Sequence, residues 1–189
     1  MTRTFIAVDL SDEARSALRR EMGTLARALP TVRFVAPESL HLTLAFLGEL
    51  DEERLAEVMA ATEAAARDSA PFTLALGWLG TFGPAVAPKV IWAGVEGDVR
   101  ALRAVQARLA DELAARGFPR EERAFAPHLT LARVKQPLDV DALARLAARV
   151  RRSQGGGPRF AVDALRVMKS ETSRAGAQYT CLREYALGA

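Results

Sequence analysis

Hydrophobic positions recur along this chain with two different periods, and each period predicts one kind of element. Short apolar runs, alternating or continuous, predict strands, whereas apolar residues every three or four positions predict amphipathic helices. In the first half, strands are predicted over 4–8, 41–47 and 72–79, and helices over 12–28 and 52–67. In the second half, strands are predicted over 90–95, 128–134 and 160–168, and helices over 99–116 and 140–151. A last strand is predicted over 178–185.

Residues at the helix ends support these boundaries. Ser11 and Asp51 stand directly before two predicted helices, where a short polar side chain can accept a hydrogen bond from a free backbone N–H group. Gly117 follows the helix predicted over 99–116, at a position where a left-handed residue commonly ends a helix. The element order β-α-β-α-β is therefore predicted twice.

One pentapeptide occurs in both halves. His41-Leu42-Thr43-Leu44-Ala45 is repeated letter for letter as His128-Leu129-Thr130-Leu131-Ala132, 87 residues later. We therefore predict one domain over 1–189, built from an internal repeat of about 1–89 and 90–189. The expected fold class is α+β. Two lobes related by a pseudo-twofold axis, each an antiparallel-rich sheet with helices on the outside, would flank a central cleft.

The composition is that of a folded domain. The chain has 189 residues, 50% of them hydrophobic, with 26 Lys and Arg against 23 Asp and Glu. These values exclude a disordered or fibrous protein. Residues 1–94 hold 9 basic and 12 acidic side chains, whereas residues 95–189 hold 17 and 11. The second half is therefore better suited to an anionic ligand.

Membrane, secreted and metal-binding classes do not fit this sequence. The apolar run 40–47 contains His41 and Thr43 and is too short to span a membrane. The N-terminus lacks the long apolar segment of a secretory signal, so we expect a cytoplasmic protein without a membrane partner. Cys181 is alone and cannot form an internal disulfide, and two histidines give no zinc ligand set. We expect no metal site and no cofactor.

The repeated pentapeptides are the candidate site. Residues two apart in a strand point to the same face, so His41 with Thr43, and His128 with Thr130, form two polar pairs. The opposite, core face carries Leu42, Leu44, Leu129 and Leu131. A lone histidine on a half-buried strand is usually a packing residue, but identical pentapeptides in otherwise divergent halves favour a functional pair. Pseudo-symmetry would bring both pairs to one cleft.

Two imidazoles without a carboxylate or metal partner suit proton transfer at phosphorus. An ordinary imidazole has a pKa of about 6.5, so near neutrality one ring can accept a proton while the other donates one. The base would activate water and the acid would protonate the departing alkoxide. The hydroxyls of Thr43 and Thr130 would hold the non-bridging oxygens. A strained cyclic phosphodiester needs no metal for this route.

The two motifs resemble those of the 2H phosphoesterase superfamily. Within it, the chain is most similar to the bacterial and archaeal RNA 2′,3′-cyclic phosphodiesterases, once called 2′-5′ RNA ligases. The resemblance extends beyond the motifs to 5–9, 37–40, 45–48, Pro127, 132–133, and the tail residues Ser170, Gly176, Tyr179 and Leu182.

This resemblance implies an activity and a set of roles. The activity is metal-independent hydrolysis of an RNA or nucleoside 2′,3′-cyclic phosphate to a 2′-phosphate. His41 would be the acid that protonates the 3′-oxygen, and His128 the base that activates water. Exchanging the roles would give a 3′-phosphate instead. Ser170 and Tyr179 would contact substrate, although either could equally be structural.

Phe46 and Arg133 each follow their histidine by five residues. A nucleobase could stack between the aromatic ring of one and the guanidinium of the other. Strict alternation opposes this, because it places both on the leucine face unless the strands bulge, and Gly48 favours a bulge in the first strand alone. Core packing is the alternative for Phe46. Trp78 and Trp92 are predicted to be core residues.

The sequence is also compatible with two other functions. RNA end-joining would run the same displacement in reverse, and a non-catalytic nucleotide-binding module would keep the cleft without turnover. The high concentration of water favours hydrolysis, and intact His and Thr in both motifs favour catalysis. Because the two halves complete the cleft within one chain, we expect a monomer without an obligate protein partner.

Overall fold

The structure of the protein, a computed structural model, describes residues 1–153, 157–173 and 176–189. Its helices are α1 (Asp12–Ala28), α2 (Glu52–Arg67), α3 (Val99–Ala115), α4 (Val140–Ser153) and the short 3₁₀ helix η1 (Pro37–Ser39). Its strands are β1 (Thr2–Val8), β2 (Leu42–Leu50), β3 (Phe72–Phe82), β4 (Val90–Gly97), β5 (Leu129–Arg133), β6 (Arg159–Val162), β7 (Ala164–Ser173) and β8 (Gly176–Ala186). The predicted helices all form, with ends that differ by a few residues at most.

The end residues act largely as predicted. The Ser11 side chain accepts a hydrogen bond from the Ala14 backbone N–H, and Asp51 accepts one from Arg54. Gly117 follows α3 with a φ of +76°, the left-handed conformation that glycine adopts without steric cost. These contacts fix where the helices begin and end relative to the strands.

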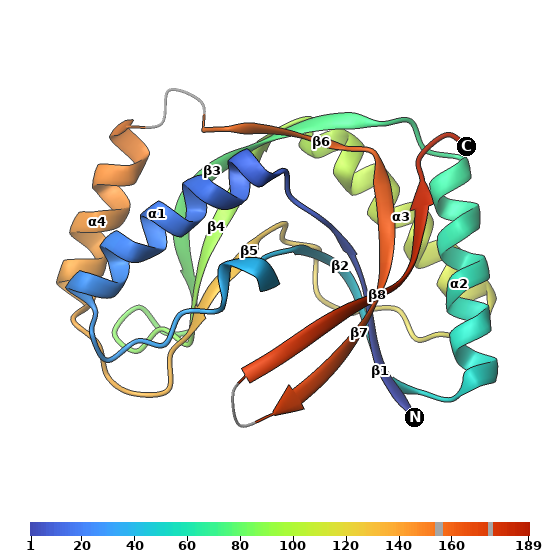
Figure 1. Cartoon of the computed structure of the whole chain (residues 1–189), viewed down its shortest axis with the longest axis horizontal. Coiled ribbons are helices and arrows are strands. Elements are labelled where there is room, and N and C mark those ends of the chain that lie inside the picture. Colours follow the sequence, from blue (N-terminus) through green and yellow to red (C-terminus); the bar gives the residue numbers. More distant parts are fainter. Residues whose placement is uncertain (154–156, 174–175) are drawn as a thin grey trace.

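The strands of the described residues form one curled antiparallel sheet in the order β6-β3-β4-β5-β2-β1-β7-β8 (Figure 1). The prediction of two separate sheets is therefore wrong. β2 and β5 join the two sides at the centre, where Leu42 pairs with Leu129. This join makes the sheet continuous and places the two repeated pentapeptides side by side.

Each side of the sheet combines strands from both halves of the sequence. β3, from the first half, pairs with β4, and β7, from the second half, pairs with β1. The strand predicted over 160–168 is in fact two strands, β6 and β7, which separate at Asp163. They lie toward opposite ends of the strand order, so the curl of the sheet must bring these ends together. The repeat boundary at about residues 89 and 90 stays a prediction.

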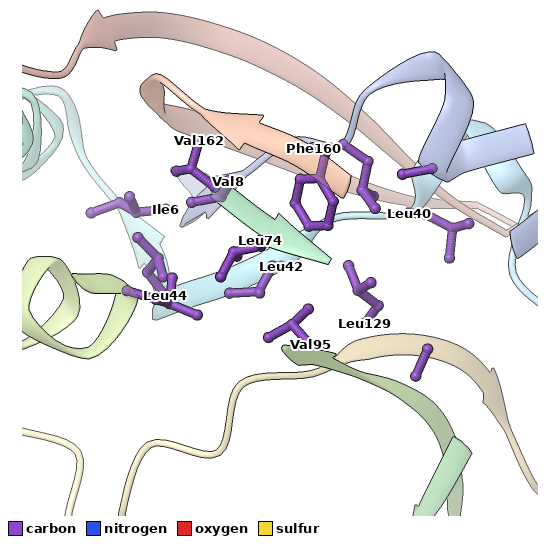
Figure 2. Packing of buried hydrophobic residues seen from close by; sticks show 14 of the residues in the cluster. Ile6, Val8, Leu40, Leu42, Leu44, Leu74, Val95, Leu129, Phe160 and Val162 are labelled. Carbon is purple, nitrogen blue, oxygen red and sulfur yellow. The ribbon is translucent and has the colours of Figure 1, made fainter. Parts of the chain in front are cut away.

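The helices lie in two pairs on either side of the curled sheet. α1 lies beside α4, and α2 lies beside α3, so each pair again takes one helix from each half (Figure 1). The leucine face of the central strands is buried, as predicted, with Leu42 and Leu129 fully buried. Figure 2 shows these two side chains among other buried residues, including Phe160. No helix in the described ranges is long and apolar enough to cross a membrane.

Candidate active site

The pairing of Leu42 with Leu129 determines where the polar side chains lie. Both leucines point into the core, so the flanking residues point to the other face of the sheet. Antiparallel register places His41 next to Thr130 and Thr43 next to His128. All four side chains are half-buried. The structure thus brings the predicted acid, base and hydroxyl groups together at the centre of the sheet.

The two imidazoles are oriented in the same way. His41 Nδ1 lies 2.8 Å from the carbonyl oxygen of Ser39, and His128 Nδ1 lies 2.7 Å from that of Ala126. A carbonyl oxygen only accepts, so each Nδ1 carries the hydrogen. In the neutral ring, Nε2 is then the acceptor, and in the charged ring it is a donor. Nε2 is therefore the atom of each histidine that is available for proton transfer.

Aromatic side chains pack around both rings. Phe5 lies 4.7 Å from His41 between ring centroids, and Tyr179 meets His41 edge-on at 5.0 Å. On the other side, Phe82 meets His128 edge-on at 4.8 Å, and Trp92 lies 6.4 Å away. Phe5 and Trp92 are 87 residues apart, the same offset as the two histidines. Their packing restricts how each imidazole can turn.

Burial lowers the pKa of His41 from its ordinary value, although the hydrogen bond with Ser39 partly opposes this. The positive charges of Arg15 and His128 lower this pKa further. Repulsion between two nearby imidazolium groups disfavours the doubly protonated state. Burial and these two nearby positive charges thus all favour the neutral form of the His41 ring.

Bulges in both central strands place Phe46 and Arg133 on the histidine face. Ala45 and Thr43 pair with the adjacent residues Ile6 and Ala7, so Leu44 is an extra residue in β2. In β5, Ala132 and Thr130 likewise pair with Ile91 and Trp92, so Leu131 is an extra residue there. An extra residue inverts the alternation that follows it. The expectation that Gly48 would bend the first strand alone is wrong, because β5 bulges at the equivalent leucine.

A cavity of about 850 Å³ runs along this face. Its lining includes six of the predicted site residues, His41, Thr43, Phe46, Arg133, Ser170 and Tyr179. His128 and Thr130 do not line it; they lie directly before and on the neighbouring strand β5, opposite Thr43 and His41 respectively. The lining also includes the cations Arg3, Arg33 and Lys135, and no carboxylate among the described residues. Its electrostatic character suits a polyanion.

Phe46 and Arg133 lie on opposite sides of the central leucine pair, because antiparallel strands run in opposite directions from it. The register therefore argues against one base stacked between both side chains. The Phe46 ring is 58% exposed, which excludes core packing, and the Arg3 guanidinium lies 5.0 Å from its centroid. Arg3, rather than Arg133, is the cation beside this ring.

Several residues at the site were not predicted from the sequence. Trp92 was expected in the core but is only partly buried and packs near His128, while Trp78 is 39% exposed. Phe5 and Trp92 could have been found by aligning the two halves at the 87-residue offset. Aligning the two halves does not identify Phe82, because its contact with His128 depends on the pairing of β3 with β4 of the second half. Within the described ranges, no three His, Cys, Asp or Glu side chains gather as metal ligands would.

Known proteins are similar to this chain in sequence and in fold. The sequence model described as the 2′-5′ RNA ligase superfamily matches residues 12–174. A curated RNA 2′,3′-cyclic phosphodiesterase from Methanothermobacter thermautotrophicus is 35% identical over 185 residues, 98% of either chain. Another, from Geobacillus stearothermophilus, is 41% identical over 147 residues, which are 76% of this chain but 46% of that protein. The crystal structure of E. coli LigT complexed with 3′-AMP has a TM-score of 0.74 at 29% identity, covering 100% of this chain and 99% of LigT.

Proposed function

Because the chain belongs to the 2′-5′ RNA ligase superfamily, we propose that it is an RNA 2′,3′-cyclic phosphodiesterase that leaves 2′-phosphate ends by paired histidine acid-base catalysis. One observation supports this most strongly. The Leu42–Leu129 pair sets two His-x-Thr units side by side, with matching Nδ1 contacts on both rings. An acid and a base of the same kind are thereby available on one face of the sheet.

In the proposed reaction, water attacks phosphorus while Nε2 of His128 takes its proton. The bond between phosphorus and the 3′-oxygen breaks, and Nε2 of His41 gives its proton to that oxygen. The phosphate keeps its charge on the non-bridging oxygens, to which the Thr43 and Thr130 hydroxyls donate hydrogen bonds. Acid-base groups of this kind contribute roughly 10²–10⁴-fold each. No step requires a metal ion or a cofactor.

The low pKa of His41 has to be reconciled with its role as the acid. Burial favours the neutral ring in the free protein. A cyclic phosphate carries a negative charge, and an anion beside an imidazole favours the charged form. Substrate binding would therefore raise the pKa of His41 and help to supply the proton that the 3′-oxygen receives.

The cavity supplies the proposed substrate contacts. Phe46 offers an exposed ring for a base to stack on. Arg133, on the other side of the central pair, is exposed and would contact a phosphate of the RNA strand. Ser170 lines the same cavity, and Tyr179 meets the edge of the His41 ring. The proposed ligand is thus an RNA end or a small cyclic nucleotide, whose base would contact Phe46 and, in RNA, whose neighbouring phosphate would contact Arg133.

Activity of histidine variants tests this proposal. His41→Ala and His128→Ala should each lower the rate of ring opening by roughly 10²–10⁴-fold, because each removes one proton-transfer group. Both variants should still bind a nucleoside 2′-phosphate, measured by calorimetry, because the other cavity residues remain. A wild-type protein that binds the nucleotide without turnover would instead indicate a binding module. Joined strands as the main product would indicate ligation.

A further inference from the structure

Arg15, on the first turn of α1, holds the turn that precedes His41. Its Nη1 group faces the backbone carbonyl oxygens of Pro37 at 2.8 Å, Leu40 at 3.1 Å and Glu38 at 3.2 Å. The side chain is only 16% exposed. The Pro37 carbonyl also accepts a hydrogen bond from the Leu40 backbone N–H. Later carbonyl groups of a short helix have no partner within it, and a guanidinium can contact several at once. One half-buried cation therefore contacts three of the carbonyl groups of this turn.

The remaining carbonyl of the turn is the one that orients the imidazole. Ser39 lies between Glu38 and Leu40, and its oxygen contacts His41 Nδ1 at 2.8 Å. Because peptide groups are planar, fixing the carbonyls on both sides leaves little freedom for the Ser39 carbonyl. Arg15 does not line the cavity, so any effect on the direction of the His41 ring is transmitted by the backbone, while its charge lowers the pKa of His41 through space.

The other end of the Arg15 guanidinium is anchored to the sheet. Its Nη2 group pairs with Asp9, and the second carboxylate oxygen of Asp9 pairs with Arg166 of β7. The Leu10 backbone N–H also donates to Asp9 at 2.8 Å. Asp9 thus connects β1, α1 and β7 at one point, and the position of the guanidinium follows from the sheet.

The second half contains a weaker version of the same arrangement. Arg103 of α3 donates through Nη1 to the carbonyl oxygen of Phe125 at 2.8 Å. Phe125 directly precedes Ala126, whose carbonyl orients His128. Arg103 is exposed and contacts one carbonyl, whereas Arg15 contacts three. Helix arginines therefore hold the segments before both histidines.

We propose that Arg15 is a positioning residue for His41, one that sets the direction of the imidazole through the Pro37–Leu40 carbonyls. The expected change in kcat rests on the proposed function, because it presupposes that the protein opens cyclic phosphates. The structural consequence of the proposal, the orientation and titration of the His41 ring, can be measured without turnover. The chain has only two histidines, so His128→Ala identifies the His41 signal in a nuclear magnetic resonance spectrum.

Arg15→Met and Arg15→Lys are the informative variants, and Arg19→Gln is the matched control. Arg19 lies one turn later on α1 and contacts the same turn through the Glu38 side chain at 2.5 Å, without contacting its carbonyls. Lysine keeps the charge of Arg15 but cannot reproduce the planar fork. For each variant, kcat, KM, the pH profile and the NMR titration of both rings would be recorded at a temperature where circular dichroism shows the native fold.

We expect Arg15→Met to lower kcat about 10–100-fold with little change in KM, as for a misplaced catalytic group. Loss of the positive charge should also raise the pKa of His41. Arg15→Lys should lower kcat while moving this pKa less, and Arg19→Gln should change neither. A kcat and a His41 titration that both stay at wild-type values in Arg15→Met would overturn the proposal. If wild-type protein shows no turnover, the proposed function fails, and the His41 signal of Arg15→Lys, which keeps the charge, decides the role of Arg15: a signal identical to wild type would overturn it.

Discussion

Each of the two histidines has its Nδ1 bonded to the carbonyl of the residue two positions earlier. This favours one tautomer in both rings and leaves Nε2 of each ring available for proton transfer. Their surroundings are not identical: burial, and then the positive charge of Arg15, lower the pKa of His41, whereas Arg103 in the second half is exposed. Two identical sequence motifs can therefore serve as different groups, an acid and a base.

The pH dependence follows from this difference. As the acid, His41 must be protonated, so activity should fall as pH rises through its pKa, which burial lowers in the free protein. In kcat/KM, which reports the free enzyme, the alkaline limb should lie below the ordinary value of about 6.5. In kcat, which reports the complex, the bound anion should shift this limb to higher pH. Identical limbs in the two profiles would contradict His41 as the acid beside the phosphate.

The threonine hydroxyls can be tested by conservative exchange. Thr43→Ala removes a donor to the non-bridging oxygens and should lower kcat about 10²–10³-fold. Thr43→Ser keeps the hydroxyl and should retain most of the activity. Steady-state rates on a cyclic nucleotide would measure both. Equal losses in the two variants would indicate that the methyl group, and hence packing, is what matters at this position.

At the scale of elements, the sequence predicts the helices and central strands well, because each has a clear apolar period and end residues such as Ser11 and Asp51. It indicates a bulge near Gly48 in the first central strand alone, and it predicts neither the bulge at Leu131 nor the break at Asp163. A bulge depends on how neighbouring strands pair, and nothing in the order of apolar residues records that pairing. For this reason the sequence alone does not predict on which face of the sheet Phe46 and Arg133 lie.

Two glycines provide a test of element packing. A Cβ built on Gly80 of β3 would lie 2.3 Å from the Trp92 ring, which packs near His128. Gly80→Ala should therefore lower both stability and kcat.

Gly23 lies within α1, and a Cβ added there would have the end of the Arg27 side chain as its nearest neighbour, at 3.9 Å. Gly23→Ala should raise the free energy of unfolding by about 0.5–1 kcal/mol, measured by urea denaturation, at unchanged kcat.

At the scale of the whole molecule, the two halves share one sheet. The sequence indicates the repetition of elements but not which strands pair, and separate sheets were the simplest expectation. The structure instead pairs β3 with β4 and β7 with β1, across the two halves. Long-range pairing of this kind cannot be predicted from local periodicity. It also ties the positions of the two histidines to the integrity of the whole chain.

The halves should accordingly not fold alone. In a fragment of residues 1–89, β1 and β2 can still pair with each other, but β1 lacks its partner β7 and β2 lacks its partner β5. β3 lacks both of its partners, β4 and β6. We expect circular dichroism to show no cooperative thermal transition for 1–89, whereas the whole chain should unfold in a single step. A native-like transition in the fragment would show that the first half is an independent domain.

The most direct test of the central claim is the identity of the terminal phosphate. Wild-type protein, with EDTA present, would be incubated with an oligoribonucleotide that ends in a 2′,3′-cyclic phosphate, and the product end would be determined by mass spectrometry and phosphatase digestion. Metal-independent catalysis with His41 as the acid at the 3′-oxygen predicts a 2′-phosphate. A 3′-phosphate would reverse the roles of His41 and His128, and activity abolished by EDTA would contradict the two-histidine mechanism.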